Sequence, residues 1–393
     1  MNIALLVSGM LPSGKESLTI TTMSFARQLQ HNENFVAIVT RNKGNQQINE
    51  IPQINEINEI PFVKLRNFQF LPLYNKLLAF PLGFYKLQRR KQIKINIIHG
   101  FSSSPGLVLR SLLAKWLFSP KVKVIHTLRS YPIRKDLDKK NWNSFLSFLC
   151  AISYRLLNYA DLVTVQTKCH ARDLIRNKVN AEKIRVVRSH INLETFYPQN
   201  RDSLKLKYGY QNKLIVFNYG AMWEIKGTEY LIKSIPQVLR KLPSALFVFA
   251  PRNYEQALQM YKPLIKALNI ERNVKFIAEN IPIAEYVALA DAVVLPYPHL
   301  EGTEGNPSCL LESLACGTPV ITTQLPELQE VFFDCAIFVP PRNSSALAEA
   351  IIGVLTKKNE QLILSGLKKA KDFDLKLISQ QFLELYASTL TYR

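Results

Sequence analysis

The sequence alternates, twice over, between short runs of β-branched and aliphatic residues and longer amphipathic stretches. Runs of this length match buried strands, and strands separated by helix-length segments are typical of parallel sheets covered by helices. The alternation stops at a polar stretch, 201–211, and then begins again. The pattern therefore predicts an α/β protein with two doubly wound domains.

The predicted strands and helices fix the domain boundaries. The first domain has strands at 2–7, 36–40, 95–98, 123–127, 162–165 and 184–187, and helices at 17–30, 105–117 and 168–178. The second has strands at 214–217, 245–250, 274–277, 292–295, 319–322 and 336–339. We expect domains at 1–198 and 199–374, and a final amphipathic helix within 375–393 that can pack on either one. The repetitive segment 46–60 is expected to be an irregular insertion without chemistry.

Positive charge is concentrated in the first half of the chain. Residues 1–200 hold 29 Lys and Arg against 11 Asp and Glu, whereas 201–393 hold 21 against 19. This asymmetry indicates that the first half meets an anionic surface or ligand.

The apolar runs are too short to cross a bilayer, and the first of them, Ile3 to Val7, is too short for a signal core. We therefore expect a cytoplasmic protein, with peripheral binding to the inner face of the membrane as an option. Five cysteines without a C-x-x-C pair signal neither a disulfide framework nor a zinc site.

The strongest chemical signal is the segment 304–317, which contains two glutamates and ends at a glycine. Asn306 can cap a helix whose first position is Pro307, so that the amides of Ser308, Cys309 and Leu310 form an anion site. Glu312 falls in the second turn, where its carboxylate can accept hydrogen bonds from a ribose diol, and Glu304 precedes the cap, where it can face a sugar. The alternative is that both acids simply favour a helix N-terminus.

This segment, with Leu-Leu-Glu-Ser-Leu-Ala-Cys-Gly-Thr-Pro-Val, resembles glycosyltransferase family 4. Further similarity lies at 160–167, 183–187, 192–198, 220–227, 273–277 and 290–296, so the resemblance covers nearly the whole chain. It implies the GT-B fold, in which two Rossmann-like domains face a cleft. It also implies transfer of a sugar, a hexose in the expected case, from a nucleotide-diphosphate donor with retention of configuration.

The resemblance identifies the loop from Gly220 to Gly227 as a phosphate loop. Lys226 is expected to neutralise the leaving diphosphate in place of a metal ion, so neither a metal nor another cofactor is expected. The bland alternative is a solvent-facing lysine. Relatives usually carry an arginine directly after the first glycine, where this chain has Ala221, and Arg252 is a candidate substitute.

On the acceptor side, the resemblance places a loop near Gly14 against the transferred sugar. It also aligns Arg129 with a position where relatives commonly have a histidine, so that Arg129 is expected to meet an anionic acceptor or phosphate. His126, on the same predicted strand, is either an acceptor-side group or a core histidine with satisfied hydrogen bonds.

Two other motifs are rejected as functional sites. Gly9 to Glu16 nearly matches a P-loop, but Glu16 replaces the magnesium-binding hydroxyl and would repel phosphate. Asp136-Leu-Asp138 and Asp372-Phe-Asp374 have a metal-site spacing but lie among lysines, which favours solvated charge clusters.

The segment Lys64 to Lys94 has eight basic and six aromatic residues and no acid. This mixture suits the headgroups of an anionic membrane, and we prefer that partner to nucleic acid because no nucleic-acid-binding motif accompanies it. An ordinary cationic helix face is the third reading.

The expected function is therefore a glycosyltransferase acting on an anionic or lipid-linked glycan, in polysaccharide or glycolipid synthesis. The alternatives are a catalytically degenerate glycan-binding protein, a P-loop-like NTPase and a nucleic-acid-binding protein.

Overall fold

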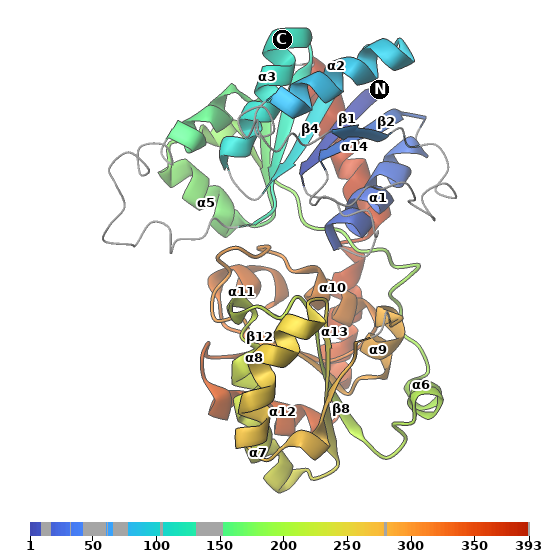
Figure 1. Cartoon of the computed structure of the whole chain (residues 1–393), viewed down its shortest axis with the longest axis vertical. Helices are drawn as coiled ribbons and strands as arrows, with labels where there is room; N and C mark the ends of the chain where they lie inside the picture. The colour runs from blue at the N-terminus through green and yellow to red at the C-terminus, as the bar shows by residue number, and fades with distance from the viewer. Residues whose placement is uncertain are drawn as a thin grey trace. The chain divides into compact units, whose positions relative to one another are not determined.

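The computed structural model describes residues 1–8, 17–31, 33–41, 60, 62–65, 78–102, 105–130, 152–278 and 281–391, and the chain divides into two units (Figure 1). Unit 1 comprises Met1–Arg188 with Leu375–Arg393, and unit 2 comprises Ser189–Asp374. The division falls after Arg188 rather than after Pro198. The reason is local: the Ile191 amide donates to the Phe373 carbonyl at 2.8 Å, which ties this strand of chain to unit 2.

The sheet of unit 1 has seven parallel strands in the order β3-β2-β1-β4-β5-β6-β7. They are β1 (Asn2–Ser8), β2 (Phe35–Arg41), β3 (Phe62–Leu65), β4 (Ile97–Ser102), β5 (Lys123–Leu128), β6 (Leu162–Val165) and β7 (Ile184–Val186). The helices that cover them are α1 (Ser17–Gln30), α2 (Ala79–Lys91), α3 (Val108–Phe118), α5 (Lys168–Arg176) and α14 (Leu375–Thr391).

Both faces of this sheet are buried, because alternate strand residues pack on different helices. Ile3 and Leu5 belong to a core with α1 and α14, whereas Ala4 and Leu6 belong to a core with α2, α3 and α5. The final helix, α14, thus completes a core of unit 1 although it follows unit 2 in the chain.

Unit 2 repeats the arrangement with six parallel strands in the order β10-β9-β8-β11-β12-β13. The strands are β8 (Leu214–Gly220), β9 (Ala245–Pro251), β10 (Val274–Phe276), β11 (Ala292–Leu295), β12 (Val320–Thr323) and β13 (Ile337–Val339). The helices are α6 (Arg201–Tyr208), α7 (Thr228–Lys241), α8 (Tyr254–Ala267), α9 (Ile283–Leu289), α10 (Ser308–Ala315), α11 (Pro326–Phe332), α12 (Ser344–Thr356) and α13 (Glu360–Lys371). One face packs on α7, α8 and α12.

Two doubly wound Rossmann-like units are therefore confirmed. In each sheet the strand order reverses beside the first strand, between β1 and β4 and between β8 and β11. Ligands of such sheets bind beyond the carboxyl ends of the strands at this switch point. The sequence did not predict β3, and no helix in the described part of the chain is long and apolar enough to span a membrane.

Candidate functional site

The residues expected to bind a nucleotide sugar gather at the switch point of unit 2. Gly220 ends β8, the loop to Lys226 and Gly227 follows it, and α10 begins shortly after β11. The sheet thus brings together segments that lie more than 80 residues apart in the chain.

Gly227 holds the loop against the neighbouring strand. Its φ is +72°, and a Cβ on it would lie 2.0 Å from the carbonyl oxygen of Pro296, just beyond β11. Only glycine combines that backbone angle with that approach. The carbonyl oxygen of Glu224 accepts from the Gly227 amide at 3.0 Å, which closes the short 3₁₀ turn Glu224–Lys226. The position of Lys226 is therefore set by backbone geometry.

Lys226 is partly buried, and its ammonium lies 5.0 Å from the centre of the Tyr297 ring. Burial lowers the pKa of Lys226, the positive charge of Arg252 lowers it further, and Glu304 opposes both effects. No carboxylate within the described ranges lies within ion-pair distance of Lys226. It is not the solvent-facing lysine of the bland alternative.

Arg252 is a second cation at this site. Its amide donates to the Gly220 carbonyl at 3.0 Å, so it stands directly beside the end of β8. Its charge acts on Lys226, Glu312 and Cys309, and its side chain is exposed. As with Lys226, the described part of the chain provides it with no ion pair.

The start of α10 differs in detail from the prediction. The helix begins at Ser308, and its N-cap is Pro307 in an extended conformation with no side-chain cap, whereas Asn306 had been expected there. Asn306 is fully buried, and its carbonyl oxygen accepts from the Ser189 hydroxyl at 3.1 Å. The Leu310 amide donates to the Pro307 carbonyl, so only the amides of Ser308 and Cys309 remain for an anion at this end.

Glu312 in α10 is bound to the strand beside it. The Tyr219 hydroxyl of β8 donates to Oε2 of Glu312 at 2.8 Å and lies 3.0 Å from the Cys309 carbonyl. Burial raises the pKa of Glu312, while the Tyr219 hydrogen bond and the charge of Arg252 lower it. Tyr219 could not be identified as a site residue from the sequence, because a tyrosine in a buried strand is usually a core residue.

Glu304 is partly buried in the loop before α10, close enough to act on the pKa values of Lys226 and Glu312. Burial raises the pKa of Cys309 to about 12, so this residue is a neutral thiol at physiological pH. The structure thus brings five of the predicted residues into one cluster: Gly220, Lys226, Glu304, Cys309 and Glu312. Arg252 and Tyr219 belong to the same cluster.

The two acceptor-side residues of unit 1 do not come together. Arg129 follows β5 and donates to the Thr21 hydroxyl of α1 at 3.4 Å. His126 lies on β5, where Val124 and Leu128, two residues before and after it, pack in the core with α2 and α3, on the face of the sheet opposite α1. His126 is thus in the core, but its hydrogen bonding is incomplete.

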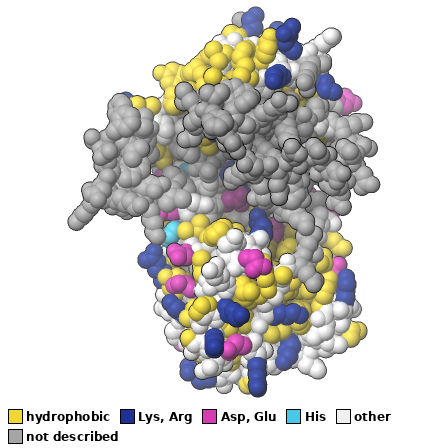
Figure 2. All heavy atoms as spheres, in the orientation of Figure 1, with side chains coloured by type: hydrophobic (Ala, Val, Ile, Leu, Met, Phe, Trp, Pro, Cys, Tyr) yellow, Lys and Arg dark blue, Asp and Glu magenta, His cyan; other side chains and the backbone are white. Residues whose placement is uncertain are grey.

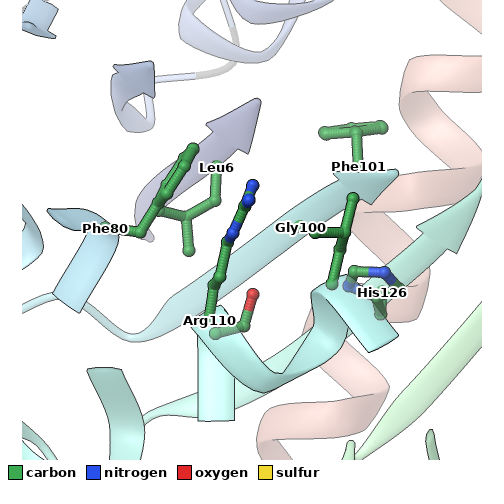
Figure 3. A pocket seen from close by; sticks show the side chains of 8 residues that line it. Leu6, Phe80, Gly100, Phe101, Arg110 and His126 are labelled. Atoms are coloured by element: carbon green, nitrogen blue, oxygen red, sulfur yellow. The ribbon is translucent and has the colours of Figure 1, made fainter. Parts of the chain in front are cut away.

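His126 is 1% exposed, and burial together with Arg110 lowers its pKa to about 3. Its Nε2 is 2.8 Å from the Ser102 hydroxyl, while its Nδ1 is buried without a hydrogen-bond partner. The ring lines a small cavity with Arg110, Gly100 and Phe80 (Figure 3). The cavity, about 10 Å³, admits one water-sized atom.

His99 is a second buried histidine, for which the sequence predicts no role. Its Nδ1 is 2.6 Å from the Tyr386 hydroxyl of α14, and its Nε2 is 2.6 Å from the Thr127 hydroxyl. Burial lowers its pKa, so it is neutral. It is a structural residue that fixes α14 to the sheet.

Several predicted features lie outside the described residues, namely Gly14 with the rest of 9–16, Asp136 and Asp138, and Cys150. Asp372 is described and pairs with Lys369 at 3.4 Å. The described residues include no group of three or more His, Cys, Asp or Glu suited to a metal ion.

Comparison with known families accounts for both halves of the chain. Residues 18–195 match the model described as Glycosyltransferase Family 4, and residues 213–357 match Glycosyl transferases group 1. A D-inositol 3-phosphate glycosyltransferase of Corynebacterium jeikeium is 26% identical over 78% of this chain and 75% of its own length. An N-acetyl-alpha-D-glucosaminyl L-malate synthase of Bacillus anthracis is 22% identical over 68% and 67%.

A phosphatidyl-myo-inositol mannosyltransferase of Mycobacterium leprae is 24% identical over 42% of this chain, and the match spans 44% of that enzyme, less than half its length. Among solved structures, Anabaena Alr3699/HepE in complex with UDP superposes with a TM-score of 0.77, at 18% identity over 99% of this chain and 100% of that one. Sucrose-phosphate synthase of Thermosynechococcus elongatus gives 0.76 at 20% identity over all of both chains.

Proposed function

Because the chain belongs to glycosyltransferase family 4 and has the GT-B fold, we propose that unit 2 binds a nucleotide-diphosphate sugar whose sugar passes, with retention of configuration, to an acceptor held by unit 1. The observation that carries this proposal is the pair of cations, Lys226 and Arg252, at the switch point of unit 2. We further propose that transfer needs no metal ion.

A bound diphosphate explains why two cations stand together here. The charge of Arg252 lowers the pKa of Lys226, and Lys226 is also partly buried, so two cations held together here are electrostatically unfavourable without an anion. A diphosphate beside them would form charge-assisted hydrogen bonds with both side chains. The amides of Ser308 and Cys309, at the start of α10, would add two more donors.

The two cations would also supply the electrostatic stabilisation that metal-dependent transferases take from a divalent ion. Negative charge grows on the diphosphate as the bond to the sugar breaks, and fixed cations lower the energy of that state without rearranging. The leaving phosphate can itself take the acceptor proton, so the proposal requires no protein base.

We assign Glu312 to the ribose. The hydroxyls of Tyr219 and Ser308 both hydrogen-bond to its carboxylate, but a carboxylate has about four acceptor sites, so it can still accept from a ribose hydroxyl. Because Cys309 is a neutral thiol, we assign it no chemistry beyond its backbone amide. Glu304, in the loop before α10, is assigned to the transferred sugar.

The acceptor is proposed to be anionic. The relatives are named for phosphatidyl-myo-inositol, D-inositol 3-phosphate and L-malate, each of which carries a negative charge. Residues 60–135 of unit 1 contain 15 Lys and Arg and no acid. Arg129, at the end of β5, is the cation that we assign to the acceptor.

The test is calorimetric binding of UDP-, GDP- and ADP-sugars, with EDTA present, followed by the free diphosphate and nucleoside of the base that binds. Lys226→Ala and Arg252→Ala should each weaken the diphosphate about 10- to 100-fold, because each removes a charge-assisted contact, and should leave the nucleoside unchanged. Glu312→Gln should weaken both ligands.

The matched control is Lys233→Ala, which removes an exposed lysine of α7 that pairs with Glu229. It should bind as the wild type does. If no donor binds, the proposal fails and a binding-only protein becomes the better account. If binding requires magnesium, the metal-independent step is wrong.

A further inference from the structure

Unit 1 carries an exposed aromatic surface that the proposed chemistry does not use. Tyr85 of α2 stacks on Phe118 at the end of α3, with ring centres 4.9 Å apart. Trp116, two residues earlier, packs edge-on against Tyr159 at 6.1 Å. Leu117 lies between Trp116 and Phe118 in the chain, and we call these five residues together the aromatic surface.

These large apolar side chains are substantially exposed to solvent. Trp116 is 48% exposed, Leu117 55% and Tyr159 63%. Leaving large apolar groups in water forgoes about 25 cal/mol per Å², and contiguous patches of them commonly mark interaction sites. Figure 2 shows hydrophobic side chains gathered over the part of unit 1 where Figure 1 draws α2 and α3, with Lys and Arg around them.

The surroundings of the aromatic surface are strongly cationic. The sequence from 78 to 130 has no Asp or Glu, and its exposed cations include Lys86, Arg89, Lys91 and Lys121. Arg89 lies 5.7 Å from the Tyr85 ring centre, and none of these four makes an ion pair within the described ranges.

Asp161, an acid that pairs with Lys115 of α3, is already neutralised. It lies 2.8 Å from the Lys115 ammonium and 3.5 Å from that of Lys123, and it accepts from the Val124 amide. The charge that the aromatic surface presents is therefore positive, and its partner must be negative.

The aromatic surface lies at the edge of the sheet where strands begin. Phe118 ends α3 shortly before β5 starts at Lys123, and Tyr159 precedes β6. The acceptor-side edge, where β4 and β5 end, is roughly 20 Å away along the strands. A partner bound here would leave that edge open.

We propose that the aromatic surface and its cations dock unit 1 on an anionic lipid bilayer. Half-exposed Trp and Tyr with Lys and Arg at their rim suit the headgroup region, where one end of a side chain is apolar and the other wet. Single-stranded nucleic acid fits less well, because Tyr85 and Phe118 already stack on each other and do not both offer a free ring face.

The membrane contact proposed here differs from the one expected from the sequence. Phe80 and Phe84, two of the six aromatic residues of the segment Lys64 to Lys94, are core residues at 1% and 0% exposure. The exposed aromatic residues come instead from the end of α3 and from Tyr159. The inference does not depend on the donor site, so either can fail without the other.

The experiment is cosedimentation of the full chain with vesicles of phosphatidylcholine alone or mixed with phosphatidylglycerol. We expect binding only to the mixed vesicles, weakening as salt rises. Lys86→Gln with Arg89→Gln should lower the partition coefficient about 30-fold, at ~1 kcal/mol per cation. Trp116→Ala should lower it at least about tenfold.

The matched controls lie on unit 2, where Phe333 is 77% exposed and Lys358 is an exposed cation. Phe333→Ala and Lys358→Gln should bind vesicles as the wild type does, and every variant should keep the circular dichroism spectrum and thermal midpoint of the wild type, which verifies folding. Equal binding to both vesicle types, no vesicle binding, or loss of vesicle binding in the controls would each overturn the proposal. So would preferential binding of a single-stranded RNA, or dimerisation that Trp116→Ala abolishes.

Discussion

Removing one hydroxyl, with Tyr219→Phe, should expose how the donor site is held together. The Tyr219 hydroxyl is buried and has two acceptors within reach, Oε2 of Glu312 at 2.8 Å and the Cys309 carbonyl at 3.0 Å. Burial raises the pKa of Tyr219, so it remains a donor across the accessible pH range. The shorter contact, to a carboxylate, is the stronger one.

The expected cost where Glu312 is ionised is that of a hydrogen bond to a charged group, about 1.5–3 kcal/mol of unfolding free energy. The cost depends on pH. Burial raises the folded-state pKa of Glu312, so its ionisation costs the folded protein stability as pH rises through that pKa. The Tyr219 bond offsets this cost, so the penalty of Tyr219→Phe should be largest where Glu312 is ionised and should fall on acidification to that of a hydrogen bond between neutral groups, about 0.5–1.5 kcal/mol.

The assay is hydrogen exchange of the β8 amides, measured by mass spectrometry on the full chain at acidic and at mildly alkaline pH. Wild type, Tyr219→Phe, Glu312→Gln and the double variant form a mutant cycle, which isolates the pair from its surroundings. We expect the two single changes to couple more strongly at alkaline pH than at acidic pH. Equal penalties at both pH values, or additivity throughout, would refute the reasoning.

Three further outcomes are expected. Gly227→Ala should lower the free energy of unfolding by about 2 kcal/mol or more, because its φ is +72° and an added Cβ would lie 2.0 Å from the Pro296 carbonyl oxygen. The measurement is the urea midpoint. The control is Gly353→Ala, at a helical position where an added Cβ would have no atom within 4 Å, and it should be neutral or stabilising. His126, whose pKa is about 3, should show no titration by NMR between pH 5 and 8, and a midpoint in that range would contradict its buried position. Cys309, whose pKa is about 12, should react with iodoacetamide at pH 7 far more slowly than an exposed thiol, as followed by mass spectrometry.

The strands were predictable because both faces of each sheet are covered, so that β-branched runs stand out from the chain around them. β8, predicted over 214–217, runs on to Gly220, and β3 was missed because its four residues lie beside an unusual low-complexity segment. Helix ends were less certain: α10 starts one residue later than the Asn-Pro pattern indicates.

The site was only partly predictable. Lys226 and Glu312 could be found because a cation just before a glycine in a strand-to-helix loop and an acid in an apolar helix are both conspicuous. Arg252 could be named only as a candidate and Tyr219 not at all, since their roles depend on partners brought close by the sheet, 93 residues away for Tyr219 and Glu312. His99 depends in the same way on Tyr386, which lies 287 residues away.

The return of α14 to unit 1 has a consequence for how the protein is made. On the ribosome, a domain usually completes its fold as it emerges, first the N-terminal one and then the next. Here the reverse order is built in: unit 2 is whole once Asp374 has emerged, whereas the core around Phe382 and Tyr386 is still missing from unit 1. Until synthesis ends, α1 alone covers the face of the first sheet that it shares with α14, so part of that face stays exposed and can bind chaperones.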